Sequence, residues 1–286
     1  MATAVICEFN PFHNGHKYLL ESAKNVLKEP VIAIMSGSFT QRGEVAVCDK
    51  FVRAKSALEN GADLVLEMPV VFSLSGAEGF AKAGVAIASA FECTNHLAFG
   101  SESGDCELLK KSANAVCDER VQALVRDGMK NGGYYPRELE NAVKTVFGDE
   151  ISSVLCEPNN ILGVEYIKAL NGTGVEPFSV ARTGVAHDSR IAGEGFASAS
   201  HIREMLRNGE NAKKYAPYIP DEITFPENLD RPLLYRLRIM TREDIAKLPD
   251  VGEGLENRIA DAAVRCSTSS EIADLVKTKR YTHARI

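Results

Sequence analysis

The first hundred residues alternate short apolar runs with segments that carry apolar residues at helical spacing. The apolar runs are 5–7, 31–35, 64–66 and 97–99. The helical segments between them are 15–27, 50–60 and 77–90, the second with Asp49 as its predicted N-cap and Gly61 as its stop. Continuous apolar runs separated by helices are typical of a parallel sheet buried on both faces. The pattern predicts an α/β fold with a doubly wound, Rossmann-like parallel sheet.

The remainder of the chain is mostly helical by its pattern. Helices are expected within 104–147, with breaks at 131–133 and Pro136, and at 160–170 and 200–208, with a fifth strand at 177–180. A polar stretch with four prolines then has the composition of a connector. We therefore predict a boundary near residue 205, between a domain at 1–205 and a small helical extension at 206–286. The short helices expected in this extension are 242–248, 255–265 and 269–276.

The length and composition limit the class of protein. A chain of 286 residues is enough for one large domain with a small appendix. The net charge of −6 excludes a global positive field, although a local basic patch stays open. Seven cysteines without zinc-site spacing predict reduced thiols and no dedicated metal site. Because no signal peptide pattern and no apolar stretch of ~18 residues occurs, we expect a cytoplasmic protein.

The most specific local motif is the run 8–16, EFNPFHNGH, which follows the first predicted strand and opens the first predicted helix. Pro11 and Gly15 favour a tight turn between the two. His13 and His16 then lie at the positive end of a helix dipole, where an anion binds favourably. Two imidazoles that donate to phosphate oxygens suit adenylyl transfer. Elsewhere in a chain the same motif would more often be surface or capping histidines, but its place after the first strand favours the anion site.

This motif is similar to the HxGH signature of the nucleotidyltransferase superfamily related to class I aminoacyl-tRNA synthetases. A second signature of that superfamily, a Ser/Thr-rich turn ending in Ile-x-Arg, resembles the run 198–203, SASHIR. The resemblance implies that Ser198, Ser200 and Arg203 form a phosphate-binding turn, with Arg203 at the outer phosphates and Ser200 as the helix cap. His13, His16 and Arg203 are the expected catalytic residues.

Six blocks together resemble the bacterial tRNA(Met) cytidine acetate ligase family. They are EFNPFHNGH (8–16), MSGSFTQRGE (35–44), GADLVLEMP (61–69), FGSE (99–102), PNNILG (158–163) and KTKRYT (277–282). The blocks span nearly the whole chain, so their joint specificity is high. The resemblance implies ATP-dependent activation of acetate as acetyl-adenylate, followed by acetyl transfer to the 4-amino group of the wobble cytidine of elongator tRNA(Met).

The resemblance also implies an ATP site at the carboxyl edge of the sheet, where such folds bind nucleotides. Its expected residues are Ile6, Cys7, Glu8, Phe9, Asn10, Pro11, Phe12, His13, Asn14, Gly15, His16, Lys17, Tyr18, Leu19, Gly100, Asn159, Arg182 and Thr183. Arg182 has a planar guanidinium suited to a triphosphate. Considered singly, Gly100, Asn159 and Arg182 are better explained as a turn glycine, a turn asparagine and a surface arginine.

The polar loop after the second predicted strand is a candidate lining for an acetate or cytidine pocket. Gln41 and Arg42 are its candidate ligands, with Arg42 expected to bind a carboxylate or the pyrophosphate. The equal alternative is an ion pair of Arg42 with a nearby acid that fixes the loop. Asp63 and Glu67 flank the third predicted strand, and orienting the neighbouring loops is the favoured role for both.

The last ten residues hold four Lys or Arg and no acid, and they are the candidate tRNA surface. The expected contacts are Lys277, Lys279, Arg280, Tyr281 and Arg285, with the cations at phosphates and an aromatic face for base stacking. A solvated tail explains the same charges equally well. A second basic cluster that extends this surface is expected at Arg231, Arg236, Arg238 and Arg242.

Members of the resembled family continue well beyond the KTKRYT block, whereas this chain ends at Ile286. We therefore expect a C-terminally short chain, whether truncated, naturally short or cut at a frame break. Adenylate formation is expected to survive this shortening, and tRNA engagement is expected to suffer from it.

ATP is the expected cofactor, with Mg²⁺ expected from the chemistry of ATP, and acetate and elongator tRNA(Met) are the expected partners. Two alternatives stay open. One is a nucleotidyltransferase of the same fold that adenylylates a small metabolite, and the other is a non-catalytic, ATP-responsive tRNA-binding module.

Overall fold

The computed structural model describes residues 1–41, 43–182, 195–278, 281 and 286. The chain forms two compact units, one of Met1–Gln41 with Ala46–Ile223 and one of Arg42–Val45 with Thr224–Ile286. Each unit is described by itself below.

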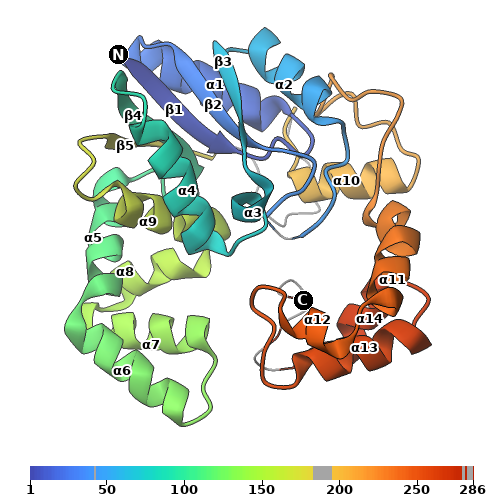
Figure 1. The fold of residues 1–286 in the computed structure, drawn as a ribbon. Helices are drawn as coiled ribbons and strands as arrows, with labels where there is room; N and C mark the ends of the chain where they lie inside the picture. The colour runs from blue at the N-terminus through green and yellow to red at the C-terminus, as the bar shows by residue number, and fades with distance from the viewer. Residues whose placement is uncertain (42, 183–194, 279–280, 282–285) are drawn as a thin grey trace. The chain divides into compact units, whose positions relative to one another are not determined.

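The first unit is built on a five-stranded parallel sheet with the strand order β3-β2-β1-β4-β5 (Figure 1). Its strands are β1 (Ala2–Cys7), β2 (Val31–Ser36), β3 (Leu64–Met68), β4 (Thr94–Ser101) and β5 (Glu176–Ala181). All five were predicted, the first four from their apolar runs, and the doubly wound parallel sheet is confirmed.

Helices cover both faces of this sheet. Successive side chains of a strand point to opposite faces, so each strand contributes side chains to the packing on both. In β1, Ala4 and Ile6 belong to one buried cluster, which also holds Phe80 of α4 (Ala77–Ser89). Val5 and Cys7 belong to a second cluster on the other face, which also holds Leu20 of α1 (Asn14–Leu27). Every residue of β1 and β2 is buried, as continuous apolar runs require in a two-faced sheet.

The connection from β2 to β3 contains α2 (Lys50–Glu59). Asp49 caps this helix as predicted, since its carboxylate accepts a hydrogen bond from the Phe51 amide at 2.8 Å. Gly61 follows the helix with φ of +118°, a conformation that favours glycine. A short helix, α3 (Val70–Ser73), follows β3 and was not predicted.

Between β4 and β5 the chain forms a helical layer. Its elements are α5 (Cys106–Cys117), α6 (Glu119–Lys130), α7 (Tyr135–Phe147), α8 (Asp149–Ser153), the 3₁₀ turn η1 (Val154–Cys156) and α9 (Pro158–Leu170). Pro136 was predicted as a helix break, but it lies in the first turn of α7, where a proline needs no amide partner.

The last helix of the first unit is α10 (Ala199–Arg207). The segment after it stays with the first unit, so the units divide between Ile223 and Thr224 and not near residue 205. The physical reason is local packing. Ala212 and Ala216 bury against Ile202 of α10, and the Tyr218 hydroxyl donates to Asn60 Oδ1 at 2.7 Å.

The second unit is helical. Its elements are η2 (Pro226–Leu229), α11 (Asp230–Ile239), α12 (Arg242–Ala246), α13 (Leu255–Arg265) and α14 (Ser269–Val276). α13 and α14 have the predicted bounds. α11 was missed because Pro232, expected to belong to a connector, lies within its first turn.

All seven cysteines are free thiols. Across the residues that the structure describes, none of the helices has both the length and the apolar character needed to span a membrane.

Candidate functional site

The expected site residues gather at the carboxyl edge of the parallel sheet. Glu8 follows β1, the loop that carries Gln41 follows β2, Gly100 lies near the end of β4, and Arg182 follows β5 and donates its amide to the Ser101 carbonyl at 2.9 Å. In an open α/β sheet, ligands bind at this edge, where the strand order reverses. In this sheet the reversal lies between β1 and β4.

The two histidines of the HxGH motif cap α1 with their rings. His13 is the N-cap, and its Nδ1 accepts a hydrogen bond from the Gly15 amide at 3.0 Å. His16 returns the contact, because its Nδ1 accepts from the His13 amide at 3.3 Å. The two rings stack with their centroids 3.7 Å apart. Since both Nδ1 atoms act as acceptors, this hydrogen-bond pattern leaves each neutral ring with its proton on Nε2, as a donor to a ligand.

The surroundings keep both rings neutral. Burial lowers the pKa of His13 to about 3, with further lowering by the positive charges of Arg182 and Arg203. Burial also lowers the pKa of His16 well below its ordinary value, and His13 and Arg182 add to the effect. Near neutral pH the pair therefore offers two dipolar N–H donors rather than two cations.

The turn before α1 has an unusual backbone. Phe9 has φ of +48°, which is strained for a residue with a side chain, and the Asn10–Pro11 peptide bond is cis. The Phe9 ring is buried against Phe12 and His16, with centroid distances of 5.0 and 4.9 Å. These contacts fix the turn that presents the two imidazoles.

Arg203 reaches this turn from α10, because its Nη1 donates to the Asn10 carbonyl at 2.8 Å. The two predicted signatures are therefore in direct contact. The helix cap differs from the prediction. Ser198 is the N-cap of α10 and its hydroxyl accepts from the His201 amide at 3.1 Å, whereas Ser200 lies inside the first turn. Only the residue preceding the first helical position can cap in this way, so the capping role predicted for Ser200 is wrong.

A chain of polar contacts links the ends of β4 and β5. Glu102 accepts from the Asn159 side-chain amide at 2.6 Å, and its other oxygen accepts from the Asn160 amide at 2.8 Å. Its charge therefore lies at the N-terminus of α9, where the helix dipole stabilises it. Asn159 then turns its oxygen toward Arg182, whose Nη1 donates to it at 3.5 Å. Glu102 was part of a family block but was not predicted to be a site residue.

Arg182 retains unused hydrogen-bonding capacity. Its Nε is buried and has no hydrogen-bond partner in the described part of the chain. Burial also lowers the pKa of the guanidinium. A buried donor without an acceptor is costly, and an anionic ligand would relieve that cost. A Cβ placed on Gly100 would make only ordinary contact with the Arg182 side chain, at 3.5 Å, so packing against the protein does not require glycine there.

The loop after β2 is tied to the turn after β1. The Gln41 amide donates to Glu8 Oε1 at 2.6 Å, and the Val47 amide donates to Asn10 Oδ1 at 2.7 Å. The side-chain nitrogen of Gln41 is buried, and the described residues provide no partner for it. Arg42 lies outside the described residues. Asp63 and Glu67 have the structural role favoured above, since Asp63 pairs with Lys24 and Glu67 with Lys50.

The expected ATP-binding run from Ile6 to Leu19 has mixed roles. Several of its side chains belong to the hydrophobic core, namely Ile6, Cys7, Phe9 and Phe12, with Leu19 packed beside them. The Asn14 side chain donates to the Gly195 carbonyl at 2.7 Å and the Lys214 carbonyl at 3.1 Å. Lys17 pairs with Glu21, and the Tyr18 ring meets Phe196 edge-on.

Comparison with known proteins shows the family. The sequence model of the HIGH Nucleotidyl Transferase family matches residues 1–286. A tRNA(Met) cytidine acetate ligase of Clostridium tetani is 36% identical over 99% of this chain and 76% of its own length. One from Thermoanaerobacter sp. (strain X514) is 38% identical over 99% of this chain and 75% of its own length. The chain belongs to the tRNA(Met) cytidine acetate ligase family.

The fold of this ligase family is shown by a solved structure. Apo TmcAL of Thermotoga maritima matches with a TM-score of 0.89 at 33% identity, over 100% of this chain and 73% of that one. A second form of the same protein is bound with alpha-thio ATP and matches with a TM-score of 0.87. The family resemblance and the Rossmann-like fold predicted from the sequence are thereby confirmed.

The residues predicted to bind tRNA in this ligase are only partly described. Lys277 follows α14 and pairs with Asp274 at 2.8 Å. Tyr281 was expected to offer a stacking face, but it is 8% exposed, packs in the core of the second unit and donates its hydroxyl to the Gly252 carbonyl. The stacking prediction is therefore wrong, because the ring is used for packing. Lys279, Arg280 and Arg285 lie outside the described residues, and so does Thr183, which was predicted for the ATP site.

The second predicted basic cluster is also partly committed to the fold. Arg238 donates to the Ala263 and Cys266 carbonyls, which satisfies the C-terminal end of α13. Arg242 binds Asp261 and Asn257 through its two terminal nitrogens. Arg231 and Arg236 are exposed on α11.

Among the described residues, no group of three or more His, Cys, Asp or Glu side chains is arranged to hold a metal ion.

Proposed function

We propose that this chain activates acetate with ATP to form acetyl-adenylate and transfers the acetyl group to the wobble cytidine of elongator tRNA(Met). The observation that carries the proposal is the pair of neutral, stacked histidines at the start of α1, in a chain that belongs to the tRNA(Met) cytidine acetate ligase family over its whole length. Such a pair can donate hydrogen bonds to phosphate oxygens, and because both rings are neutral, neither requires a negatively charged partner in the protein.

In the first step an acetate oxygen attacks the α-phosphorus of ATP, and the bond to the bridging oxygen of pyrophosphate breaks. His13 and His16 would donate their Nε2 protons as hydrogen bonds to phosphate oxygens, where negative charge develops. Arg203 and Arg182 would add positive charge near these rings. Both arginines lower the pKa of His13, so both act on the same small region.

In the second step the 4-amino nitrogen of cytidine attacks the acetyl carbon, the bond to the AMP oxygen breaks, and the amine loses a proton. Among the described residues, Gln41 is the best candidate to orient the acetyl group, since its buried side-chain nitrogen has a hydrogen bond to give. Gly100 would leave room for the nucleoside, and Asn159 would contact it. In the first step, Arg42 would bind the acetate carboxylate or the pyrophosphate.

Magnesium would enter as part of the ATP complex, because Mg²⁺ commonly keeps several waters and binds through substrate phosphates.

The two steps of the reaction would be divided between the two units of the chain. The first unit would carry adenylate formation, and basic residues of the second unit, among them Lys277, Arg231 and Arg236, would contact tRNA phosphates. We place the reaction in the cytoplasm, consistent with seven free thiols.

The test is acetate-dependent exchange of labelled pyrophosphate into ATP by the purified chain. We expect exchange only when acetate, ATP and Mg²⁺ are all present. Exchange that is indifferent to acetate would contradict the proposal and favour a metabolite adenylyltransferase, which a screen of phosphorylated metabolites by pyrophosphate release would identify.

The transfer step needs its own test. Methionine tRNA is incubated with the chain, acetate and ATP, and its nucleosides are analysed by mass. The expected product is N4-acetylcytidine at the wobble position. Binding of ATP and tRNA without any AMP release would instead indicate a non-catalytic tRNA-binding module.

A further inference from the structure

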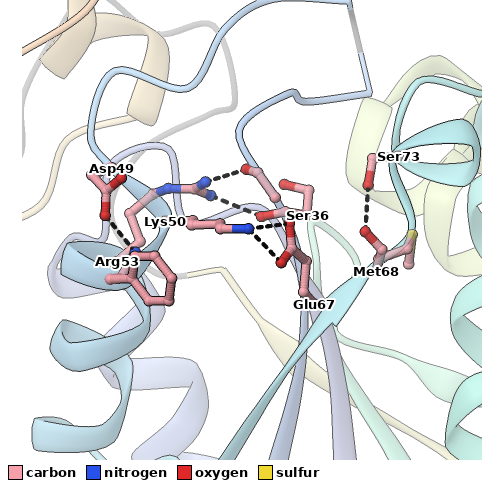
Figure 2. Close-up of polar contacts among 9 residues, drawn as sticks. Ser36, Asp49, Lys50, Arg53, Glu67, Met68 and Ser73 are labelled. Carbon is pink, nitrogen blue, oxygen red and sulfur yellow. Dashed lines mark hydrogen bonds and ion pairs between the residues drawn. The ribbon is translucent and has the colours of Figure 1, made fainter.

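Arg53 is the largest fully buried side chain in the described part of the chain, with an exposed fraction of 1%. It extends from α2 to Ser36 at the end of β2 (Figure 2) and to the Glu8 carbonyl, which follows β1. Its acceptors are main-chain carbonyls, those of Glu8, Ser36, Gly37 and Cys48. Within the described residues Arg53 forms no ion pair with a carboxylate. Burial lowers the pKa of its guanidinium, because removing a charged group from water costs free energy.

All four carbonyls belong to segments that carry or border residues of the proposed site. Glu8 begins the turn that carries His13 and His16. Ser36 and Gly37 begin the loop that reaches Gln41, and Cys48 closes that loop before α2. The Arg53 guanidinium therefore joins the turn after β1 to both ends of the loop after β2.

The contact with Glu8 lies directly beside the strained residue of the turn. Phe9 has φ of +48°, and the carbonyls on both sides of it are held by arginines, Glu8 by Arg53 and Asn10 by Arg203. A strained backbone conformation persists only where the surrounding contacts fix it.

Neighbouring side chains add further contacts between α2 and the strand ends. Lys50, in the first turn of α2, binds the carboxylate of Glu67 at the end of β3 with a contact of 2.7 Å (Figure 2). The Glu67 carboxylate lies against Gly37 so closely that a Cβ on Gly37 would clash with its Oε1. The first residues of α2 thus make contacts at the ends of β1, β2 and β3.

We propose that Arg53 is a positioning residue of the HxGH turn, which it holds in its ligand-binding shape before ATP and acetate arrive. A buried cation bonded only to carbonyls could be replaced by apolar packing if stability were its purpose. Its acceptors instead share one property, since each belongs to a segment that presents a site residue. The inference rests on the proposed function for its catalytic consequence, but not for the geometry of the turn.

The first test uses the ligand-free chain. Arg53→Lys keeps the charge, but one ammonium group cannot reach carbonyls of four residues, and Arg53→Met removes the charge at similar length. Val143→Ala is the matched control, because Val143 is fully buried in α7 among the neighbouring helices of the helical layer. The ring Cε1–H signals of His13 and His16 are followed by NMR in protein labelled with ¹³C-histidine and assigned with single His→Asn variants. We expect both Arg53 variants to shift these signals and to raise the titration midpoint of His13, and Val143→Ala to leave them in place.

The second test measures acetate-dependent pyrophosphate exchange. We expect kcat to fall by roughly 10- to 100-fold in Arg53→Met and less in Arg53→Lys, with much smaller changes in KM, because misplaced reacting groups reduce the rate more than the binding. Val143→Ala should lower Tm without lowering kcat.

Three results would overturn the proposal. They are unchanged histidine signals in folded Arg53→Met, a lowered Tm with unchanged kcat, and failure of both Arg53 variants to fold at 15 °C while Val143→Ala folds, which would make Arg53 a requirement of the core. If the unmodified chain shows no acetate-dependent exchange, the proposed function fails, and the histidine signals alone then decide the role of Arg53.

Discussion

The imidazole rings of His13 and His16 lie nearly face to face, with their centroids 3.7 Å apart and their planes inclined by 28°. Each ring accepts a main-chain hydrogen bond on Nδ1 and keeps its Nε2 proton for a ligand. One pair of side chains therefore both caps the helix and provides donors for the proposed reaction, and the two roles can be separated by substitution.

His13→Asn and His16→Asn separate capping from donation. The Asn oxygen lies near the position of Nδ1 and can still accept the main-chain amide, but Asn has no donor near the position of Nε2. We expect both variants to fold, with a small change in Tm, and to lose roughly 100-fold or more in acetate-dependent exchange. His16→Gln, whose amide nitrogen lies nearer the Nε2 position, should retain more activity than His16→Asn. Unchanged exchange in the Asn variants would contradict the donor role.

Protonation of the histidine pair should destabilise the fold. The unfolded chain binds a proton at each histidine near pH 6.5, whereas folded His13 has a pKa of about 3. Between these values the unfolded state binds more protons, so the free energy of unfolding falls as the pH falls, by up to about 1.4 kcal/mol per pH unit for each such group. Urea unfolding at pH 7, 6, 5 and 4.5 measures this slope. His13→Asn should reduce it, and an identical slope in that variant would refute the assignment.

Gln41→Met should make the chain more stable and less active. The variant removes a buried side-chain nitrogen that has no partner among the described residues, and an unsatisfied buried donor costs about 1–3 kcal/mol. We expect a rise in the free energy of unfolding of about 1 kcal/mol together with a higher KM for acetate. The matched control is Gln122→Met, because Gln122 donates to the Val116 carbonyl at 2.7 Å. That control should lose stability and keep its exchange rate.

Glu102→Gln should weaken ATP binding through Asn159. A glutamine in this place has only one oxygen for the amide of Asn160 and the side chain of Asn159, so one of these donors loses its acceptor. The oxygen of Asn159 would then no longer be held toward Arg182. We expect KM for ATP to rise roughly 10-fold, the value of one charge-assisted hydrogen bond, with a smaller change in kcat. Glu165→Gln, on the same helix and paired with Lys168, is the control that should leave KM for ATP unchanged.

The fold was largely predictable because its signals are local. Continuous apolar runs predicted four of the five strands, and the caps at Asp49 and Gly61 predicted the ends of α2. The boundary near residue 205 failed for a non-local reason. Tyr218 and the alanines before it look like connector sequence, but they pack on the first unit through partners such as Asn60, far away in the chain.

The candidate site was predictable where a motif repeats a family pattern and was missed where a role depends on geometry. His13, His16, Asn159, Arg182 and Arg203 were all named from the sequence, and the structure brings His13 close to Arg203 and Asn159 close to Arg182. The role of Tyr281 was misjudged, because a sequence does not show whether an aromatic ring faces a core or a ligand. The contacts of Arg53 and Glu102 with main-chain groups were not foreseen for the same reason, since every residue carries such groups.

The order of the strands determines how much of the chain must be synthesised before the candidate site is complete. β1 leaves the ribosome first, but it completes its pairing only when β4 emerges, and β5 must then pair with β4. The turn after β1 waits longer still, because the arginine that holds the Asn10 carbonyl is at position 203. Long-range pairing of this kind slows folding. A nascent chain therefore exposes an unpaired edge of β4 until β5 has been translated, and its HxGH turn lacks the Arg203 contact until α10 has followed.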